Sequence, residues 1–184
     1  MNSDQALALP TMEELESWAG RGRVLCATGS DVAAWRLPQP AKAALLSSGV
    51  PLLDEVVHEV AFRAASTMYR LALLSDGGSA HPGWEYGAVP ETGEVRLWSA
   101  GGQGDSSFVN SSINQWLCSL HMVGSWLAAS AVIGCWRESA EAEEQALAEL
   151  ADLLRRIEAI DPAAIGDGDH EQQFWPAMLD RWLY

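Results

Sequence analysis

The chain has 184 residues, 48% of them hydrophobic and 20% charged, which is the composition of a globular protein with a substantial core and excludes a disordered chain. Its formal net charge is −14, and because an acidic surface repels phosphate backbones, we expect no nucleic-acid partner. A basic protein partner is compatible with this charge, although acidity also serves solubility alone.

The N-terminal third predicts short helices around one strand. The first five residues lack the basic and apolar regions of a signal peptide, so we expect a cytoplasmic protein. Thr11 and Glu14 have the spacing of a capping box, which predicts a helix that ends at Gly20. The next expected elements are a buried strand over residues 24–27 and a helix over residues 41–48.

The middle of the chain predicts strands. Residues 52–66 fit either a strand or a helix, and their β-branched side chains favour strands with a break. Residues 68–74 predict a half-buried strand with Tyr69, Leu71 and Leu73 on one face. A hairpin is expected around the turn Pro90–Gly93, with strands over residues 84–89 and 94–98. Glycine-rich loops are expected at residues 76–79 and 101–107.

Residues 106–136 contain no Asp, Glu, Lys or Arg, and the stretch from Trp116 to Trp136 is long enough to cross a bilayer. His121, Gly124 and several serines interrupt it, and acidic residues follow soon after it. We therefore expect two helical segments, meeting near Gly124, in the core of a soluble protein without a membrane partner. A membrane span is the disfavoured alternative.

The C-terminal part predicts helices. A helix is expected over residues 138–160, with an apolar stripe of Leu147, Leu150, Leu154 and Ile157. A polar loop over residues 166–171 and a short helix over residues 174–183 should follow. Strands followed by helices, with no repeat and no long linker, predict an α+β fold: a single domain over residues 1–184 with a mostly antiparallel sheet and helices packed to one side.

A short segment connects the last expected strand to the apolar helix. Ser111 and Ser112 can each accept a hydrogen bond from a free N–H group in the first turn of that helix. The segment Phe108-Val109-Asn110-Ser111-Ser112, ahead of a helix with an aromatic residue, resembles a signature of the SUKH superfamily of bacterial immunity proteins, in the branch numbered four. Three further segments are similar to that branch: Leu45–Pro51, Pro90–Val95, and Asp161–Ala164 together with Phe174–Trp175.

This resemblance implies a SUKH-like fold and an immunity protein that blocks a toxin by stoichiometric binding, without turnover. It supplies no catalytic residues. The cognate toxin is expected to be a basic nuclease- or deaminase-type protein. Two alternatives stay open: a regulatory or scaffold domain of the same fold that binds another protein, and, less favoured, a hydrolase whose site is assembled from distant residues.

Candidate sites for metals and cofactors fail on their own spacing. His58–Glu59 begins like a zinc-protease helix, but Phe62 stands where the second His is required, which leaves a partly exposed surface histidine. Residues 101–107 lack the Lys of a phosphate-binding loop. The acidic loop that starts at Asp167 has neither the Gly at position six nor the Glu at position twelve of a calcium loop. Cys26, Cys118 and Cys135 have no zinc spacing and are expected to be reduced, inert thiols. We therefore expect no metal, no cofactor and no catalytic residue.

The expected partner-binding residues combine charge with one aromatic. Between Glu138 and Glu171, eleven acidic residues oppose only Arg155 and Arg156, and the glycine-flanked loop within this stretch can adapt to a partner. Trp84, beside the hairpin, is the tryptophan best placed for a tight contact. The predicted set is Trp84, Glu85, Asp105, Asp167, Asp169 and Glu171. Asn110, Ser111 and Ser112 are expected to serve the fold and not to touch the partner.

Overall fold

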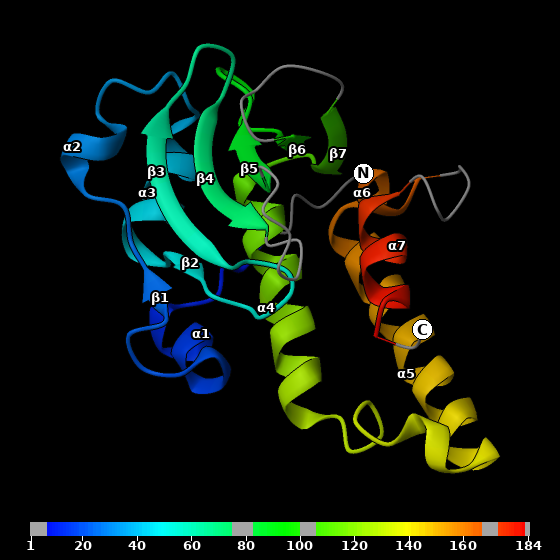
Figure 1. The fold of residues 1–184 in the computed structure, drawn as a ribbon. Coiled ribbons are helices and arrows are strands. Elements are labelled where there is room, and N and C mark those ends of the chain that lie inside the picture. Colours follow the sequence, from blue (N-terminus) through cyan, green and yellow to red (C-terminus); the bar gives the residue numbers. More distant parts are fainter. Residues whose placement is uncertain (1–6, 75–82, 100–105, 167–172, 183–184) are drawn as a thin grey trace, which may run out of the picture.

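The computed structural model describes residues 7–74, 83–99, 106–166 and 173–182 (Figure 1). In chain order the elements are α1 (Met12–Ala19), β1 (Val24–Leu25), α2 (Gly29–Val32), α3 (Gln39–Ser47), β2 (Val50–Pro51), β3 (Glu59–Ala64), β4 (Tyr69–Leu74), β5 (Trp84–Ala88), β6 (Val95–Ser99), β7 (Ser106–Asn110), α4 (Ile113–Ala129), the 3-10 turn η1 (Trp136–Glu138), α5 (Ala140–Ile160), α6 (Pro162–Ile165) and α7 (Phe174–Asp180). Strands precede the long helices, as the sequence predicted.

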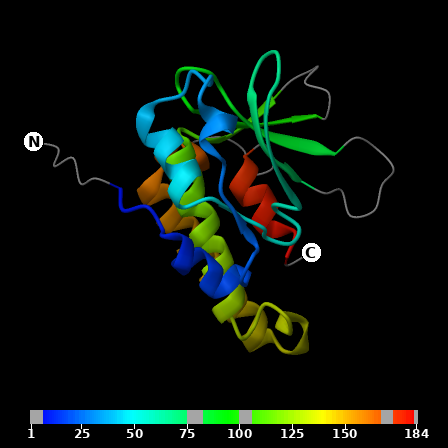
Figure 2. The ribbon, with the colours of Figure 1, turned by 90° about the vertical axis from the view of Figure 1, so that its left-hand side faces the viewer.

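The main sheet is a five-stranded antiparallel meander in the order β3-β4-β5-β6-β7, and β1 pairs with β2 in a separate two-stranded sheet. The helices of the described residues lie to one side of the main sheet, and none of them covers its other face (Figures 1 and 2). The predicted α+β fold with a mostly antiparallel sheet is confirmed. Tyr86 of β5, Trp116 of α4 and Trp175 of α7 are fully buried between the layers, and the Tyr86 ring contacts those of Trp116 and Phe174.

The predicted hairpin is present. Its turn is closed by a hydrogen bond from the backbone N–H of Gly93 to the carbonyl of Val89, at 2.9 Å. Gly93 has a φ of 73°, which glycine adopts without strain. In the ambiguous segment, residues 59–64 form a strand, and an isolated bridge between Leu53 and Val57 makes a tight turn before it. The preference for strands with a break was therefore correct.

The burial pattern of β4 differs from the predicted alternation. Its pairing with β5 shifts between Arg70 and Ala72, so the strand contains a bulge. A bulge inserts one extra residue and moves the following side chains to the opposite face. Ala72 and Leu74 are buried as a result, and Leu73, predicted to share the buried face of Tyr69 and Leu71, is only half-buried.

The apolar stretch after residue 112 forms one helix, not two segments that meet near Gly124. Helix α4 runs without a break from Ile113 to Ala129, and Gly124 is a buried residue within it. The indole of Trp18 packs onto the backbone there, and this contact offsets the roughly 1 kcal/mol by which a glycine weakens a helix. No helix among the described residues is long and apolar enough to span a membrane.

Helix α5 buries two residues of the expected stripe, Leu150 and Ile157, and in place of the other two it buries the residue that precedes each. Ala146, Leu150, Leu153 and Ile157 are buried, whereas Leu147 is 46% exposed and Leu154 is half-buried. Ala146 is the residue buried at the point where the sequence pattern favoured Leu147. Smaller differences concern helix ends: α3 begins two residues earlier than predicted, α5 begins at Ala140, and α7 ends at Asp180.

Candidate partner-binding surface

The junction between β7 and α4 is held by a buried polar network centred on Asn110, which has no exposed surface. Its side-chain amide donates to a carboxylate oxygen of Asp161 at 3.0 Å and to Ser119 at 3.3 Å. Its carbonyl oxygen accepts from the indole N–H of Trp175 at 3.1 Å. One side chain thus connects the last strand to α4, to the start of α6 and to α7.

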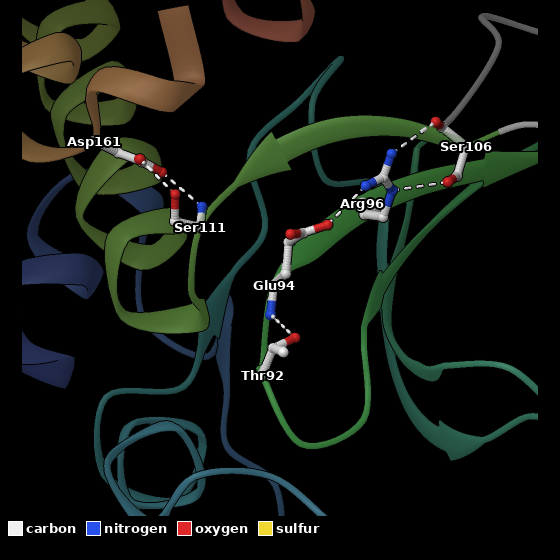
Figure 3. Close-up of polar contacts among 6 residues, drawn as sticks. All are labelled: Thr92, Glu94, Arg96, Ser106, Ser111 and Asp161. Atoms are coloured by element: carbon white, nitrogen blue, oxygen red, sulfur yellow. Dashed lines mark hydrogen bonds and ion pairs between the residues drawn. The ribbon is translucent and has the colours of Figure 1, made fainter. Parts of the chain in front are cut away.

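The two serines that follow Asn110 have different roles. Ser112 accepts from the backbone N–H of Gln115 at 3.2 Å and is the N-cap of α4, as predicted. The prediction that Ser111 also caps this helix is wrong. Its backbone N–H and its hydroxyl donate to the two carboxylate oxygens of Asp161, at 2.7 and 2.8 Å (Figure 3). The buried carboxylate competes successfully for Ser111 because it is an ionisable acceptor that needs several donors.

The start of β7 is fixed by Arg96 of the neighbouring strand. The Arg96 guanidinium donates to the hydroxyl of Ser106 at 2.8 Å and to its carbonyl at 3.3 Å, and it pairs with Glu94 at 2.7 Å (Figure 3). The backbone N–H of Glu94 in turn donates to the side chain of Thr92 at 3.2 Å. This chain of contacts runs from the hairpin turn to the end of β7 that borders a pocket.

That pocket, named here the Trp84 pocket, has a volume of about 190 Å³ and lies between the sheet and α7. The four strands β4, β5, β6 and β7 contribute one residue each, and α7 with the residue before it and the residue after it supplies the opposite wall. The lining residues are Leu74, Trp84, Leu97, Ser107, Gln173, Phe174, Ala177, Met178 and Arg181. Apolar side chains dominate among these described residues, and Arg181 is the one that carries a charge.

The structure separates the two predicted partner-binding residues that it describes. Trp84 is half-buried and lines the Trp84 pocket. Glu85 is the next residue in the strand and therefore points to the other face of the sheet. There it is only 4% exposed, and both of its carboxylate oxygens accept hydrogen bonds from the guanidinium of Arg70. This ion pair could not be predicted from the sequence, because it depends on the register of β4 against β5.

Asp105, Asp167, Asp169 and Glu171 lie outside the described residues, as do most of the two loops that contain them. Two described residues of the Trp84 pocket are close to them in sequence. Ser107 follows Asp105 by two positions, and Gln173 follows Glu171 by two positions. His58, for which the sequence predicted a surface position, is exposed.

A second and larger pocket, of about 510 Å³, escaped the sequence analysis. We name it the Trp18–Trp182 pocket after its two aromatic walls. It is lined by the end of α1, by residues 23 and 52–55, by the second half of α4, and by Trp182: the residues are Trp18, Ala19, Arg23, Leu52, Leu53, Asp54, Glu55, Gly124, Leu127, Ala128 and Trp182. These segments are distant in the chain, and no local motif could have predicted their meeting.

Burial shifts the pKa values of two titratable groups in the helical layer, His121 and Cys118. Burial lowers the pKa of His121 against the opposing effect of Glu14, and Arg156 lowers it further. The ring accepts a hydrogen bond from the indole N–H of Trp18 at 3.1 Å, which requires its neutral form. Burial also raises the pKa of Cys118 to about 11, as befits an inert thiol. The described residues contain no cluster of three or more His, Cys, Asp or Glu that could bind a metal.

The fold is that of an α+β protein with a one-sided helical layer, and its described surface offers pockets with aromatic walls. The model of the SUKH-4 immunity protein family matches residues 10–181, so the chain belongs to this family. This match confirms the resemblance found in the sequence. No curated protein and no solved structure matches the chain.

Proposed function

We propose that this protein is an immunity protein that binds a cognate protein toxin in the cytoplasm and blocks it by one-to-one binding, without turnover. The observation that carries the proposal is the family match over residues 10–181. In this proposal Asn110, Ser111 and Asp161 have a structural task, because their side chains hydrogen-bond to one another inside the fold.

The charge of the chain supports a basic toxin, such as a nuclease or a deaminase that acts on nucleic acid. The net charge is −14, and the stretch from Glu138 to Glu171 holds eleven acidic residues against two arginines. An acidic surface attracts a basic partner over several ångströms and raises the rate of association, an effect that salt screens.

We place the contact surface at the Trp84 pocket. The pocket beside the half-buried Trp84 has mostly apolar walls and can accept a side chain of the partner. Aromatic contacts that exclude water in this way often supply most of the binding energy of a protein interface. In this proposal Asp105, Asp167, Asp169 and Glu171 supply the attraction. Glu85 contributes indirectly, because its ion pair with Arg70 joins β5 to β4 beside Trp84.

Co-expression tests the function. The gene beside that of this protein is the first candidate for the toxin, and its product should arrest growth unless this protein is made with it. Rescue of growth together with recovery of the two proteins as a complex supports the proposal. A toxin that is bound but not inhibited would favour a regulatory or scaffold role, and a toxin that is destroyed by catalytic amounts of this protein would favour a hydrolase.

Kinetics test the surface. Trp84→Ala should speed dissociation of the toxin, and Asp167→Asn with Asp169→Asn should slow association. The matched control is Glu143→Gln with Glu144→Gln, which removes the same two charges from exposed positions of α5. If both double variants associate with the toxin equally slowly, the effect is due to net charge and not to the predicted loop.

A further inference from the structure

We propose that the Trp18–Trp182 pocket is a second contact surface for the toxin and that it receives a basic side chain, Lys or Arg, of that partner. The inference rests on the proposed function and adds to it a site and the chemistry that the site recognises. Three observations carry it: the fixed aromatic walls, the charge at the rim, and the position beside the Trp84 pocket.

The two aromatic walls are already held in place. The indole N–H of Trp18 donates to His121 at 3.1 Å, and the indole N–H of Trp182 donates to Glu55 at 2.8 Å. Trp18 also lies directly on Gly124, where a Cβ atom would come within 2.3 Å of its ring. Binding of a partner therefore requires little loss of side-chain entropy at these two residues, and both indole N–H groups already have an acceptor.

The rim of the pocket carries an unneutralised carboxylate. Arg23 pairs with Asp54 at 2.6 Å, so these two charges cancel. Among the described residues, Glu55 forms no ion pair, and its carboxylate accepts a hydrogen bond from the neutral indole of Trp182. Glu55 also has a φ of 69°, a left-handed backbone conformation that is uncommon for residues other than glycine and is often found at functional sites. A cation from a partner would meet both this carboxylate and the face of a tryptophan, and each attracts it.

The pocket is adjacent to the surface proposed above. Arg181 lines the Trp84 pocket and Trp182, the next residue, lines the Trp18–Trp182 pocket, so the two pockets flank the end of α7. A stable protein interface covers about 800 Å² on each partner, more than one such pocket provides. One toxin molecule can therefore cover both pockets, with its basic side chain in the Trp18–Trp182 pocket.

A small probe tests the chemistry without the toxin. Acetyl-arginine-amide at millimolar concentration should shift the indole N–H resonances of Trp18 and Trp182 in a nitrogen-15 NMR spectrum, with assignment by Trp18→Phe and Trp182→Phe. Acetyl-citrulline-amide, which has the same shape without the charge, should not shift them. Glu55→Gln keeps an oxygen that accepts from Trp182 and should abolish the response. Equal shifts with both probes, or none with arginine, would overturn the inference.

Affinity for the toxin tests the site in the complex. Glu55→Gln should weaken binding by about threefold to tenfold, and Arg23→Gln, which frees the carboxylate of Asp54, should strengthen it. The control is Glu59→Gln, an exposed carboxylate on β3 outside the pocket. If the toxin binds all three variants with wild-type affinity, the pocket is not a contact, and the proposed function stands without it. If no variant and no wild-type protein binds the toxin, the proposed function fails, and the probe experiment alone decides the pocket.

Discussion

Ser111 and Asp161 are separated by fifty residues in the chain, yet the backbone N–H and the hydroxyl of Ser111 both donate to the carboxylate of Asp161. Asp161 is only 1% exposed and also accepts from Asn110 at 3.0 Å. The start of α6 is thereby attached to the end of β7. This contact joins two segments that the family resemblance had singled out separately.

Loss of this carboxylate should be costly. Asp161→Ala leaves one N–H group of the buried Asn110 amide and the backbone N–H of Ser111 without an acceptor, and we expect a loss of about 2–4 kcal/mol in the free energy of unfolding. Urea denaturation measures it. Ser111→Ala is the control, because it removes only one hydroxyl at a more exposed position and should cost about 1 kcal/mol. Equal losses in the two variants would contradict the central role given to Asp161.

Ser112 should affect stability and leave binding unchanged. Ser112→Ala removes the cap of α4, which typically costs about 1 kcal/mol. Thermal unfolding should show the loss, while the affinity of the folded protein for its toxin stays at the wild-type value. An unchanged melting temperature combined with weaker binding would instead show that Ser112 contacts the toxin.

Gly124→Ala should destabilise the protein, although alanine normally favours a helix over glycine by about 1 kcal/mol. The added methyl group would overlap the indole of Trp18, and overpacking of this kind typically costs about 1–3 kcal/mol. Chemical denaturation should show a lower free energy of unfolding. Gly134→Ala is the matched control, since nothing lies within 4 Å of the new methyl group there. A more stable Gly124→Ala protein would show that Trp18 is not seated on α4.

Stability should fall in mild acid because of His121. Its pKa is lowered in the folded state by burial, so the unfolded chain binds a proton more readily. The stabilising contribution is complete above the ordinary pKa of 6.5 and is lost as the pH falls through that value toward the lower folded pKa. The measurement is urea unfolding at several pH values between about 8 and 5.5. His121→Gln keeps an acceptor for Trp18 and should flatten the curve in this window; an unchanged slope would exclude His121 as the cause.

Features set by neighbouring residues were predictable from the sequence. The capping box at Thr11, the hairpin around Gly93 and the cap at Ser112 each depend on a few consecutive residues, and all three are present. The overall α+β arrangement followed from the order of these elements.

Features set by distant contacts were not predictable. The bulge in β4 depends on its register with β5, and it moved Leu73 out of the predicted face. Helix α4 continues through Gly124, and the ring that covers this glycine belongs to Trp18, more than one hundred residues away. The ion pair that buries Glu85 against Arg70 likewise depends on the register of β5 against β4, whereas the separation of Trp84 and Glu85 onto opposite faces follows from strand alternation and could have been predicted. The Trp18–Trp182 pocket was not predictable for the same reason, since five separate segments of the chain form its walls.

The central claim is that this protein neutralises a toxin by stoichiometric binding, and a titration tests it most directly. The purified toxin from the neighbouring gene is held at a concentration well above the dissociation constant, and its activity is measured as this protein is added. We predict a linear fall to zero activity at one molecule of this protein per molecule of toxin. Complete inactivation at a small fraction of that ratio, or full toxin activity at an excess of this protein, would contradict the account.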